Sequence, residues 1–328
     1  MTKKLRWGVL ATGGIARSFT KDLQLTGRPV TAVGSRSLDK ARAYAAEFGI
    51  AHAHGSYEAL VADPEVDAIY IATPHPMHAD NAKLALNAGK HVLIEKPFTI
   101  NAREAQEIMT LAASRGLVAL EAMWTRFLPH MIRIREIIAA GTLGEVRSVV
   151  AEHTQDLPDD PAHRLNAMDL GGGALLDLGI YPISFVWDIL GEPELIHTEA
   201  RFRETGADAQ IATIFRHRNG AMSTTLSASD TAGPNRAHIL GTEARIEIES
   251  VWYKPTSFRV LDPKGNVLEA YDSKVEGRGM QFEAEELERL VSIGAVTGEM
   301  MPITETVGIM GTLDAIRVKV GLKYPTET

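Results

Sequence analysis

The first third of the chain alternates between short apolar runs and amphipathic stretches, and this alternation constrains the fold more than any other feature. The apolar runs lack polar alternation, so both faces of each expected strand should be buried. Strand–helix alternation of this kind predicts a parallel sheet covered by helices on both faces. The expected strands are 5–10, 30–34, 68–72, 91–94 and 117–121, and the expected helices are 15–25, 38–48, 77–88 and 101–115.

The pattern changes near residue 123. After an expected helix at 129–140, the apolar positions alternate with polar ones, which is typical of an antiparallel sheet with one exposed face. Such segments lie at 145–153, 194–202, 211–215, 221–228, 238–240 and 245–248, and late helices are expected at 282–292 and 304–322. The length of 328 residues favours two domains. We predict an α/β chain with a Rossmann-type doubly wound domain at 1–123 and a second α/β domain, with an open, mostly antiparallel sheet, at 124–328. The last helix is expected to pack back on the first domain.

Composition excludes several classes of protein. The net charge is -8 and no basic block stands out, so a nucleic-acid partner is not expected. The chain has no cysteine, which excludes disulfides, thiolate catalysis and cysteine-ligated zinc and fits a reducing cytoplasm. We find no signal peptide and no run long enough to span a membrane, so we expect a cytoplasmic protein with no membrane partner.

The first expected strand leads into a glycine-rich loop. A dinucleotide-binding fingerprint has the form Gly-x-Gly-x-x-Gly/Ala after the first strand. Here Ala11, Gly13 and Ala16 take the three positions. Gly13 would let the backbone approach a pyrophosphate at the helix N-terminus, whereas the alternative is an ordinary turn with packing glycines. The expected cofactor contacts in this loop are Ala11, Thr12, Gly13, Gly14 and Ile15.

The end of the second strand reads Gly34-Ser35-Arg36-Ser37. An acidic residue here would bind the ribose 2′-hydroxyl of NAD, and none is present. Ser35 and Arg36 favour a 2′-phosphate, so the expected cofactor is NADP, with NAD as the alternative. In the structural alternative, Arg36 is a solvated surface residue and Ser37 only caps the next helix.

The expected strand at 68–72 ends in Thr73, followed by His75 and His78. Ligands of a doubly wound sheet bind at strand ends of this kind. No third potential ligand follows the two histidines at a spacing typical of a zinc site, so we expect no metal here. We expect all three residues to contact the nicotinamide end of the cofactor.

Candidate catalytic groups come from two separate segments. The strand from residue 91 runs into Glu95, Lys96 and Pro97, and a lysine at the end of a buried strand needs a partner or a chemical role. The second segment supplies Asp177 and Tyr181, which at i and i+4 should share one helix face. Glycines at 171–173 precede them and would allow close approach to a ligand.

Lys96, Asp177 and Tyr181 together could handle a proton while a hydride leaves a substrate carbon. Each also has a structural alternative. Lys96 could pair with Glu95 or a backbone carbonyl. Asp177 could cap a helix or form an ion pair, and Tyr181 could be a packing residue whose hydroxyl contacts water.

The expected strand at 117–121 ends in Glu121 and leads to Trp124, Arg126 and Phe127. Trp124 could form the wall against an apolar ring, and Arg126 could hold a hydroxyl or a cofactor phosphate. The alternative is core packing with a surface arginine, and composition does not choose between them.

These motifs resemble the glucose-fructose oxidoreductase / inositol dehydrogenase (Gfo/Idh/MocA) family over nearly the whole chain. The resemblance rests on the loop at 11–16, Thr73-Pro-x-x-x-His78, the Glu95-Lys96-Pro97 step and the segment that carries Asp177 and Tyr181. Within the family it is strongest to the dihydrodiol dehydrogenase and NADP-dependent D-xylose 1-dehydrogenase branch. Ala11 departs from the usual first glycine of the loop.

The resemblance implies an N-terminal Rossmann domain and a homodimer formed through the open sheet of the C-terminal domain. It also implies a cis Lys96–Pro97 bond and the use of NADP. Glu95 and Lys96 join the expected cofactor contacts with Trp124 and Arg126. The expected substrate contacts are Trp124, Arg126, Phe127, Arg164, Asp177 and Tyr181.

The function that follows is oxidation of a hydroxyl of a sugar, cyclic polyol or dihydrodiol by hydride transfer to NADP⁺. Tyr181 is the expected general base, Lys96 stabilises its phenolate and the developing alkoxide, and Asp177 orients Lys96 or the substrate; the first two roles could be exchanged. The alternatives are a keto- or anhydro-sugar reductase, a sugar–sugar oxidoreductase that retains its cofactor, and a non-catalytic NADP(H) sensor.

Overall fold

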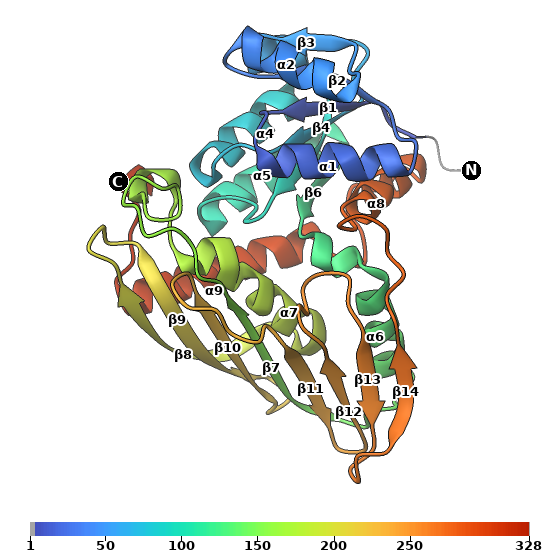
Figure 1. Cartoon of the computed structure of the whole chain (residues 1–328), viewed down its shortest axis with the longest axis vertical. Helices are drawn as coiled ribbons and strands as arrows, with labels where there is room; N and C mark the ends of the chain where they lie inside the picture. The colour runs from blue at the N-terminus through green and yellow to red at the C-terminus, as the bar shows by residue number, and fades with distance from the viewer. Residues whose placement is uncertain (1–3, 328) are drawn as a thin grey trace. The chain divides into compact units, whose positions relative to one another are not determined.

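The computed structural model describes residues 4–327 and divides into two compact units (Figure 1). One unit consists of Met1–Phe127 and Glu276–Met310, and the other of Leu128–Val275 and Gly311–Thr328. Helix α9 (Ile303–Val320) contributes its first part to the first unit and its second part to the other.

The first unit contains a six-stranded parallel sheet in the order β3-β2-β1-β4-β5-β6. This is the strand order of a doubly wound fold, which reverses next to β1 and places ligands at the carboxyl ends of the strands there. β1 and β4 are buried throughout, as their unbroken apolar sequences predict. The strands are β1 (Trp7–Leu10), β2 (Val30–Gly34), β3 (His52–His54), β4 (Ala68–Ile71), β5 (His91–Glu95) and β6 (Ala119–Ala122).

The helices of this unit begin and end at residues suited to those positions. Ser37, Ser56 and Asn101 each accept a backbone N–H at a helix N-terminus, and Gly49 and Gly116 adopt the left-handed conformation at a C-terminus. The helices are α1 (Gly14–Leu25), α2 (Leu38–Phe48), α3 (Tyr57–Val61), α4 (His78–Asn87), α5 (Ala102–Arg115) and α8 (Gln281–Ser292). The short elements β3 and α3 were not predicted from the sequence.

The second unit contains an eight-stranded sheet in the order β14-β13-β12-β11-β7-β10-β9-β8. All neighbouring pairs are antiparallel except β7 and β10, which are parallel, so the expectation of a mostly antiparallel sheet is confirmed. Its strands are β7 (Val146–Thr154), β8 (Pro193–Phe202), β9 (Asp208–His217), β10 (Met222–Ala228), β11 (Ala237–Gly241), β12 (Arg245–Ile248), β13 (Phe258–Leu261) and β14 (Val267–Tyr271). The last two strands were not predicted.

One face of this sheet is covered by helix α7 (Ile180–Leu190), which packs against β7 and β10, and α6 (Pro129–Ala139) belongs to the same unit. The helical stretch Met168–Leu190 is long and apolar enough to cross a membrane by length and composition alone. The expectation that no run reaches this length is therefore wrong. However, 83% of its most apolar window is buried, because the stretch forms the core beneath the sheet.

Ala11 adopts a strained backbone conformation that a substitution can test. It lies just after β1 with a φ of 89°, a conformation that favours glycine. Such strain costs roughly 1–3 kcal/mol, which glycine would relieve. Glycine itself lowers stability by roughly 0.5–1 kcal/mol, because its unfolded chain has more conformational freedom to lose. We expect Ala11→Gly to stabilise the protein by about 1 kcal/mol and to raise the Tm by about 2 °C in thermal unfolding followed by circular dichroism.

The matched control is Ala113→Gly, at an exposed position in α5. There the same substitution should destabilise, because glycine weakens a helix interior. A lower Tm for Ala11→Gly would contradict the assignment of strain to Ala11.

Candidate active site

The loop after β1 has the form of a phosphate cradle. Ala11 donates its N–H to the carbonyl of Gly34 at 2.9 Å, which fixes the start of the loop beside β2. Gly13 precedes α1 in an extended conformation, and no side chain in residues 4–327 caps the N-terminus of that helix. A Cβ added to Gly13 or Gly14 would meet no atom within 4 Å. The uncapped N–H groups and open space suit a pyrophosphate.

The end of β2 presents a hydroxyl and a guanidinium group. Ser35 is buried and Arg36 is exposed, while Ser37 caps α2 as its alternative interpretation predicted. Burial raises the pKa of Tyr57, and the positive charge of Arg36 opposes this shift. The arrangement offers positive charge and no carboxylate at the position that discriminates between the two nicotinamide cofactors.

The segment that carries Lys96 is held by side chains from three neighbouring elements. Tyr70 of β4 donates its hydroxyl to the Glu95 carboxylate in a short hydrogen bond. His78 of α4 contacts the carbonyl of Pro97 at 2.9 Å, and Glu121 of β6 accepts the N–H of Phe98 at 3.1 Å. The expected cis bond between Lys96 and Pro97 is confirmed. The backbone on both sides of Lys96 is therefore fixed to the sheet.

Two of these supporting groups are buried acids. Burial raises the pKa of Glu95, although the nearby positive charge of Lys96 opposes the shift. Burial also raises the pKa of Glu121 to about 7, against the lowering effect of the Phe98 N–H. The carboxyl group of Glu95 accepts the N–H of Lys96 at 3.2 Å as well, so this acid supports the backbone of the lysine.

Thr73 and His78 form a second connection between strand ends. The imidazole of His78 is fully buried, and its nitrogens lie 2.8 Å from the Thr73 carbonyl and 2.9 Å from the Pro97 carbonyl. His78 thus links the end of β4 to the Lys96 segment, and its contact with a cofactor stays a prediction. His75, with its ring centroid 5.8 Å from that of His78, is also buried.

Trp124, Arg126 and Phe127 form a buried 3₁₀ turn directly after β6. Arg126 forms a salt bridge with Glu305 of α9 and is 3% exposed. The guanidinium of Arg278 lies 5.5 Å from the ring of Trp124, within range of a cation–π interaction. Their contacts with a cofactor or substrate stay predictions.

In the second unit, Asp177 and Tyr181 lie on consecutive helical segments. Asp177 is in a π-helical turn (Leu175–Gly179), and Tyr181 is in α7. Residues four apart stay close in angle around the axis of such a helical stretch, so the expectation that Asp177 and Tyr181 share one face stays a prediction. Arg164, one of the expected substrate contacts, forms a salt bridge with Asp177 at 3.3 Å.

Tyr181 belongs to an aromatic cluster that the sequence did not predict. The ring of His153 lies 4.9 Å from Tyr181 and stacks on Tyr253 at 3.8 Å, and the two tyrosine rings are 5.3 Å apart. All three side chains are buried to more than nine-tenths. His153 could have been found from its place near the end of β7, whereas Tyr253 lies in an irregular segment with no local signal.

Gly172 and Gly173 pack closely against neighbouring residues at the start of this helix. A Cβ on Gly173 would lie 2.0 Å from the carboxylate of Asp208, and one on Gly172 would meet backbone of Leu165 and Ala167 at 2.8 Å. For Gly172 and Gly173 the expectation of a ligand approach is therefore corrected to close internal packing, and for Gly171 it stays a prediction. Asp208 accepts the N–H of Leu175 at 2.6 Å and caps the helical stretch that carries Asp177 and Tyr181.

Comparison with known proteins agrees with this architecture. Residues 5–122 match the model of an oxidoreductase family with an NAD-binding Rossmann fold, and residues 131–247 match that of the GFO/IDH/MocA C-terminal domain. Fold and sequence together define an oxidoreductase of two α/β domains. The chain belongs to the GFO/IDH/MocA family, so both the predicted fold class and the predicted family are confirmed.

Characterised relatives cover almost the whole chain. Trans-1,2-dihydrobenzene-1,2-diol dehydrogenase of Mus musculus is 35% identical over 98% of this chain and 99% of its own. D-xylose 1-dehydrogenase (NADP(+)) of Hypocrea jecorina is 35% identical over 98% of this chain and 93% of its own. A solved structure of a 3-ketoreductase from Actinomadura kijaniata, in complex with NADP and TDP-benzene, is 26% identical with a TM-score of 0.84 over 97% and 98% of the two chains.

The cap formed by Asp208 predicts a pH effect. Burial raises the pKa of Asp208 to about 7, against the lowering effect of the backbone N–H groups that it accepts. Since the folded pKa exceeds that of an unfolded aspartate, about 4, stability is greatest below pH 4 for this group and declines as pH rises through 7. Asp208→Asn removes this titration, so the Tm of the variant should fall less steeply between pH 5 and 8 than that of the wild type.

A second substitution separates titration from capping. Asp208→Ala also removes the titration but leaves the N–H of Leu175 without its acceptor, so it should be less stable than Asp208→Asn by roughly 1–3 kcal/mol at every pH. Parallel plots of Tm against pH for the wild type and Asp208→Asn would show that Asp208 does not titrate in this range.

Proposed function

We propose that the protein oxidises a hydroxyl group of a sugar, a cyclic polyol or a dihydrodiol with NADP⁺ as cosubstrate. The observation that carries the proposal is the fixed Lys96 segment at the carboxyl end of β5, in the same sheet whose β1 loop leads to an uncapped helix N-terminus. A cation held in this way near a nucleotide cradle suits a reaction in which negative charge develops on a substrate oxygen.

NADP is the proposed cofactor because Arg36 and Ser35 replace the acidic residue that binds the ribose of NAD. The name of the Hypocrea jecorina relative, which specifies NADP(+), supports the same preference. Ala11, Thr12, Gly13, Gly14 and Ile15 would hold the pyrophosphate. When bound, the nicotinamide would serve as the hydride acceptor.

The residues of the chain would manage the proton. Tyr181 is the proposed general base, and Lys96 would stabilise its phenolate and the developing alkoxide. Asp177 would orient the substrate or Lys96, and its salt bridge with Arg164 supports a charged, ordered carboxylate. Tyr181 and Lys96 would titrate as a coupled pair, so their proton roles could be exchanged.

His153 and Tyr253 extend the proposal to the surroundings of Tyr181. Their stacked rings form a wall beside this phenol, and such aromatic surfaces pack against the carbon faces of cyclic substrates. Trp124, Arg126 and Phe127 keep their predicted places in cofactor and substrate binding.

The direct test is a spectrophotometric screen at 340 nm with purified protein. NADP⁺ and NAD⁺ would be paired separately with aldoses, inositols, glycosides and dihydrodiols, and NADPH with keto-sugars. We expect reduction of NADP⁺ by one of these classes, at a higher kcat/KM than with NAD⁺. Activity only with NADPH and keto-sugars would favour a reductase. Bound NADP(H) without steady-state turnover would favour a retained cofactor or a sensor.

The catalytic assignment predicts selective loss of turnover. Lys96→Met and Tyr181→Phe should each lower kcat by roughly 10²–10⁴-fold, the contribution typical of a positioned acid or base, while NADPH binding persists. The matched controls Lys264→Met and Tyr271→Phe lie on the β13–β14 hairpin and should retain activity. Near-normal turnover in both Lys96→Met and Tyr181→Phe would contradict the mechanism.

The proposed assembly is a homodimer formed through the open face of the second sheet. His197, Ile214, Thr224, Val150 and His238 form one continuous cross-strand row over five strands. Ile214 and Val150 are 45% and 39% exposed on this row. Apolar side chains aligned on one exposed sheet face favour a self-complementary contact.

A charge in this row tests the dimer. Ile214→Glu should shift the protein to monomers in sedimentation velocity, because it places two carboxylates in the contact of a symmetric pair. Val318→Glu, at an 81% exposed site on α9, is the matched control and should leave the mass unchanged. An unaltered mass for Ile214→Glu would show that this face is not the interface. The cytoplasmic location and the absence of nucleic-acid and membrane partners stay predictions from composition.

A further inference from the structure

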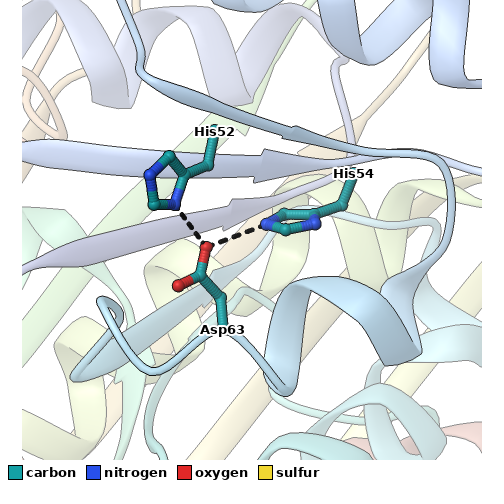
Figure 2. Close-up of side chains that lie close together, drawn as sticks. All are labelled: His52, His54 and Asp63. Carbon is teal, nitrogen blue, oxygen red and sulfur yellow. Dashed lines mark hydrogen bonds and ion pairs between the residues drawn. The ribbon is translucent and has the colours of Figure 1, made fainter.

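Two histidines and an aspartate with no part in the proposed reaction converge at the edge of the parallel sheet (Figure 2). His52 and His54 are separated by one residue on β3, so their side chains point to the same face of this edge strand. Asp63 follows α3 in the chain and lies opposite them. The Asp63 carboxylate oxygen Oδ2 lies 2.6 Å from His52 Nδ1 and 2.9 Å from His54 Nε2.

The three groups have the chemistry and convergence of a metal site. One ligand atom from each residue lies within 4.8 Å of the other two. Imidazole nitrogen and carboxylate oxygen are ligands of zinc at about 2.0–2.2 Å. We propose that His52, His54 and Asp63 bind a divalent transition-metal ion, with Zn²⁺ the best match and water completing its coordination.

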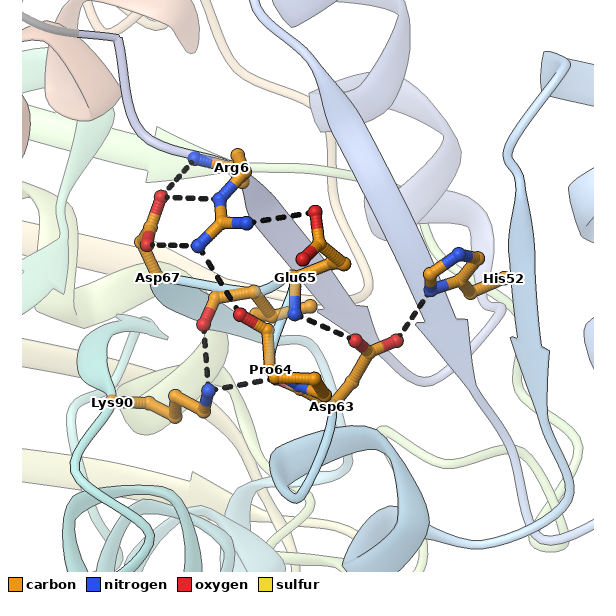
Figure 3. A network of polar contacts seen from close by, with 8 residues as sticks. Arg6, His52, Asp63, Pro64, Glu65, Asp67 and Lys90 are labelled. Carbon is orange, nitrogen blue, oxygen red and sulfur yellow. Dashed lines mark hydrogen bonds and ion pairs between the residues drawn. The ribbon is translucent and has the colours of Figure 1, made fainter.

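The carboxylate is held in place by the loop that carries it. The N–H of Glu65 donates to Asp63 Oδ1 at 2.8 Å, which leaves Oδ2 directed at the histidines. The ammonium of Lys90 donates to the carbonyls of Asp63 and Val66 at 2.8 and 2.7 Å (Figure 3). Partners that orient a ligand in this way are the usual second layer of a metal site.

The same loop is fixed to the start of β1. Arg6 contacts Glu65 at 2.9 Å and Asp67 at 2.8 Å, and its backbone N–H donates to the same Asp67 carboxylate. The two ends of the loop are thus anchored, and Asp63 keeps its direction without help from the histidines. A ligand that is already oriented loses little conformational freedom when an ion binds.

Access and space favour an ion over a purely structural cluster. The Asp63 side chain is 4% exposed, whereas those of His52 and His54 are 40% and 23% exposed. Tetrahedral coordination at about 2.1 Å separates ligand atoms by about 3.4 Å, so the rings must withdraw by less than about 1 Å. Their solvent-facing sides allow this movement. Each neutral ring would carry its proton on the nitrogen that faces away from the ion.

The test uses substitutions that keep the hydrogen bonds but lose the metal ligands. An Asn amide nitrogen reaches nearly the place of His Nδ1, and a Gln amide nitrogen that of His Nε2. His52→Asn/His54→Gln should therefore retain the N–H···O contacts with Asp63 and the fold, but amide nitrogens do not bind zinc. The probe is Zn²⁺, titrated by calorimetry into the full chain after chelator treatment and removal of any affinity tag.

We expect the wild type to bind one more equivalent of Zn²⁺ than the double variant, and Zn²⁺ to raise the Tm of the wild type but not of the double variant. His197→Gln, on the second sheet, is the matched control and should bind as the wild type does at this site. Lys90→Met should weaken the affinity of this site for Zn²⁺ by roughly 10- to 100-fold, as is typical when a residue that supports a metal ligand is lost.

Equal numbers of equivalents in the wild type and the double variant would overturn the proposal and identify the cluster as a hydrogen-bonded brace. If the double variant does not fold, His54→Gln alone decides by the same criterion. Since none of these residues belongs to the proposed catalytic set, the 340 nm assay of the double variant separates this result from the outcome of the proposed function.

Discussion

Burial of the first sheet on both faces is the constraint from which the rest of the first unit follows. A strand such as β4, buried along its whole length, cannot present a side chain to a bound ligand along its sides. Chemistry is therefore confined to the strand ends, where the backbone leaves the sheet. Ala11, Ser35, Thr73, Lys96 and Trp124 follow five of the six strands. The candidate residues of this unit form a set because one edge of one sheet collects them.

The same burial decides how Lys96 is supported. A polar residue next to a buried strand end must find partners, because an unpaired polar group in the interior costs free energy. Tyr70, His78 and Glu121 supply these partners from β4, α4 and β6. Their hydrogen bonds reach Glu95, Pro97 and Phe98, the residues on both sides of Lys96. The supporting network therefore fixes the backbone around the lysine.

The sheet of the second unit differs from that of the first, because helix α7 packs on one face and side chains on the other face are exposed. Its strands alternate along their length, and α7 packs on the covered face against β7 and β10. Asp208 reaches from β9 to the start of the helical stretch before α7, and Gly173 leaves room for its carboxylate. A buried acid at this position orients the π turn with Asp177 and, through it, the first turn of α7 with Tyr181.

Local signals explain what could be predicted from the sequence. Unbroken apolar runs, capping serines and a glycine-rich loop are each recognised from a few consecutive residues, and each of these signals predicted its strand or helix correctly. β3, α3, β13 and β14 have five residues or fewer and, unlike the equally short β1 and β4, they lack an unbroken apolar run that would separate them from loops. Contacts between distant segments carry no local signal at all. The stacking of Tyr253 on His153 and the approach of Asp63 to His52 depend on how strands pair and loops return. Motifs thus predict which residues lie at the strand ends. The partners that orient these residues come from distant segments, so they are identified only in the folded structure.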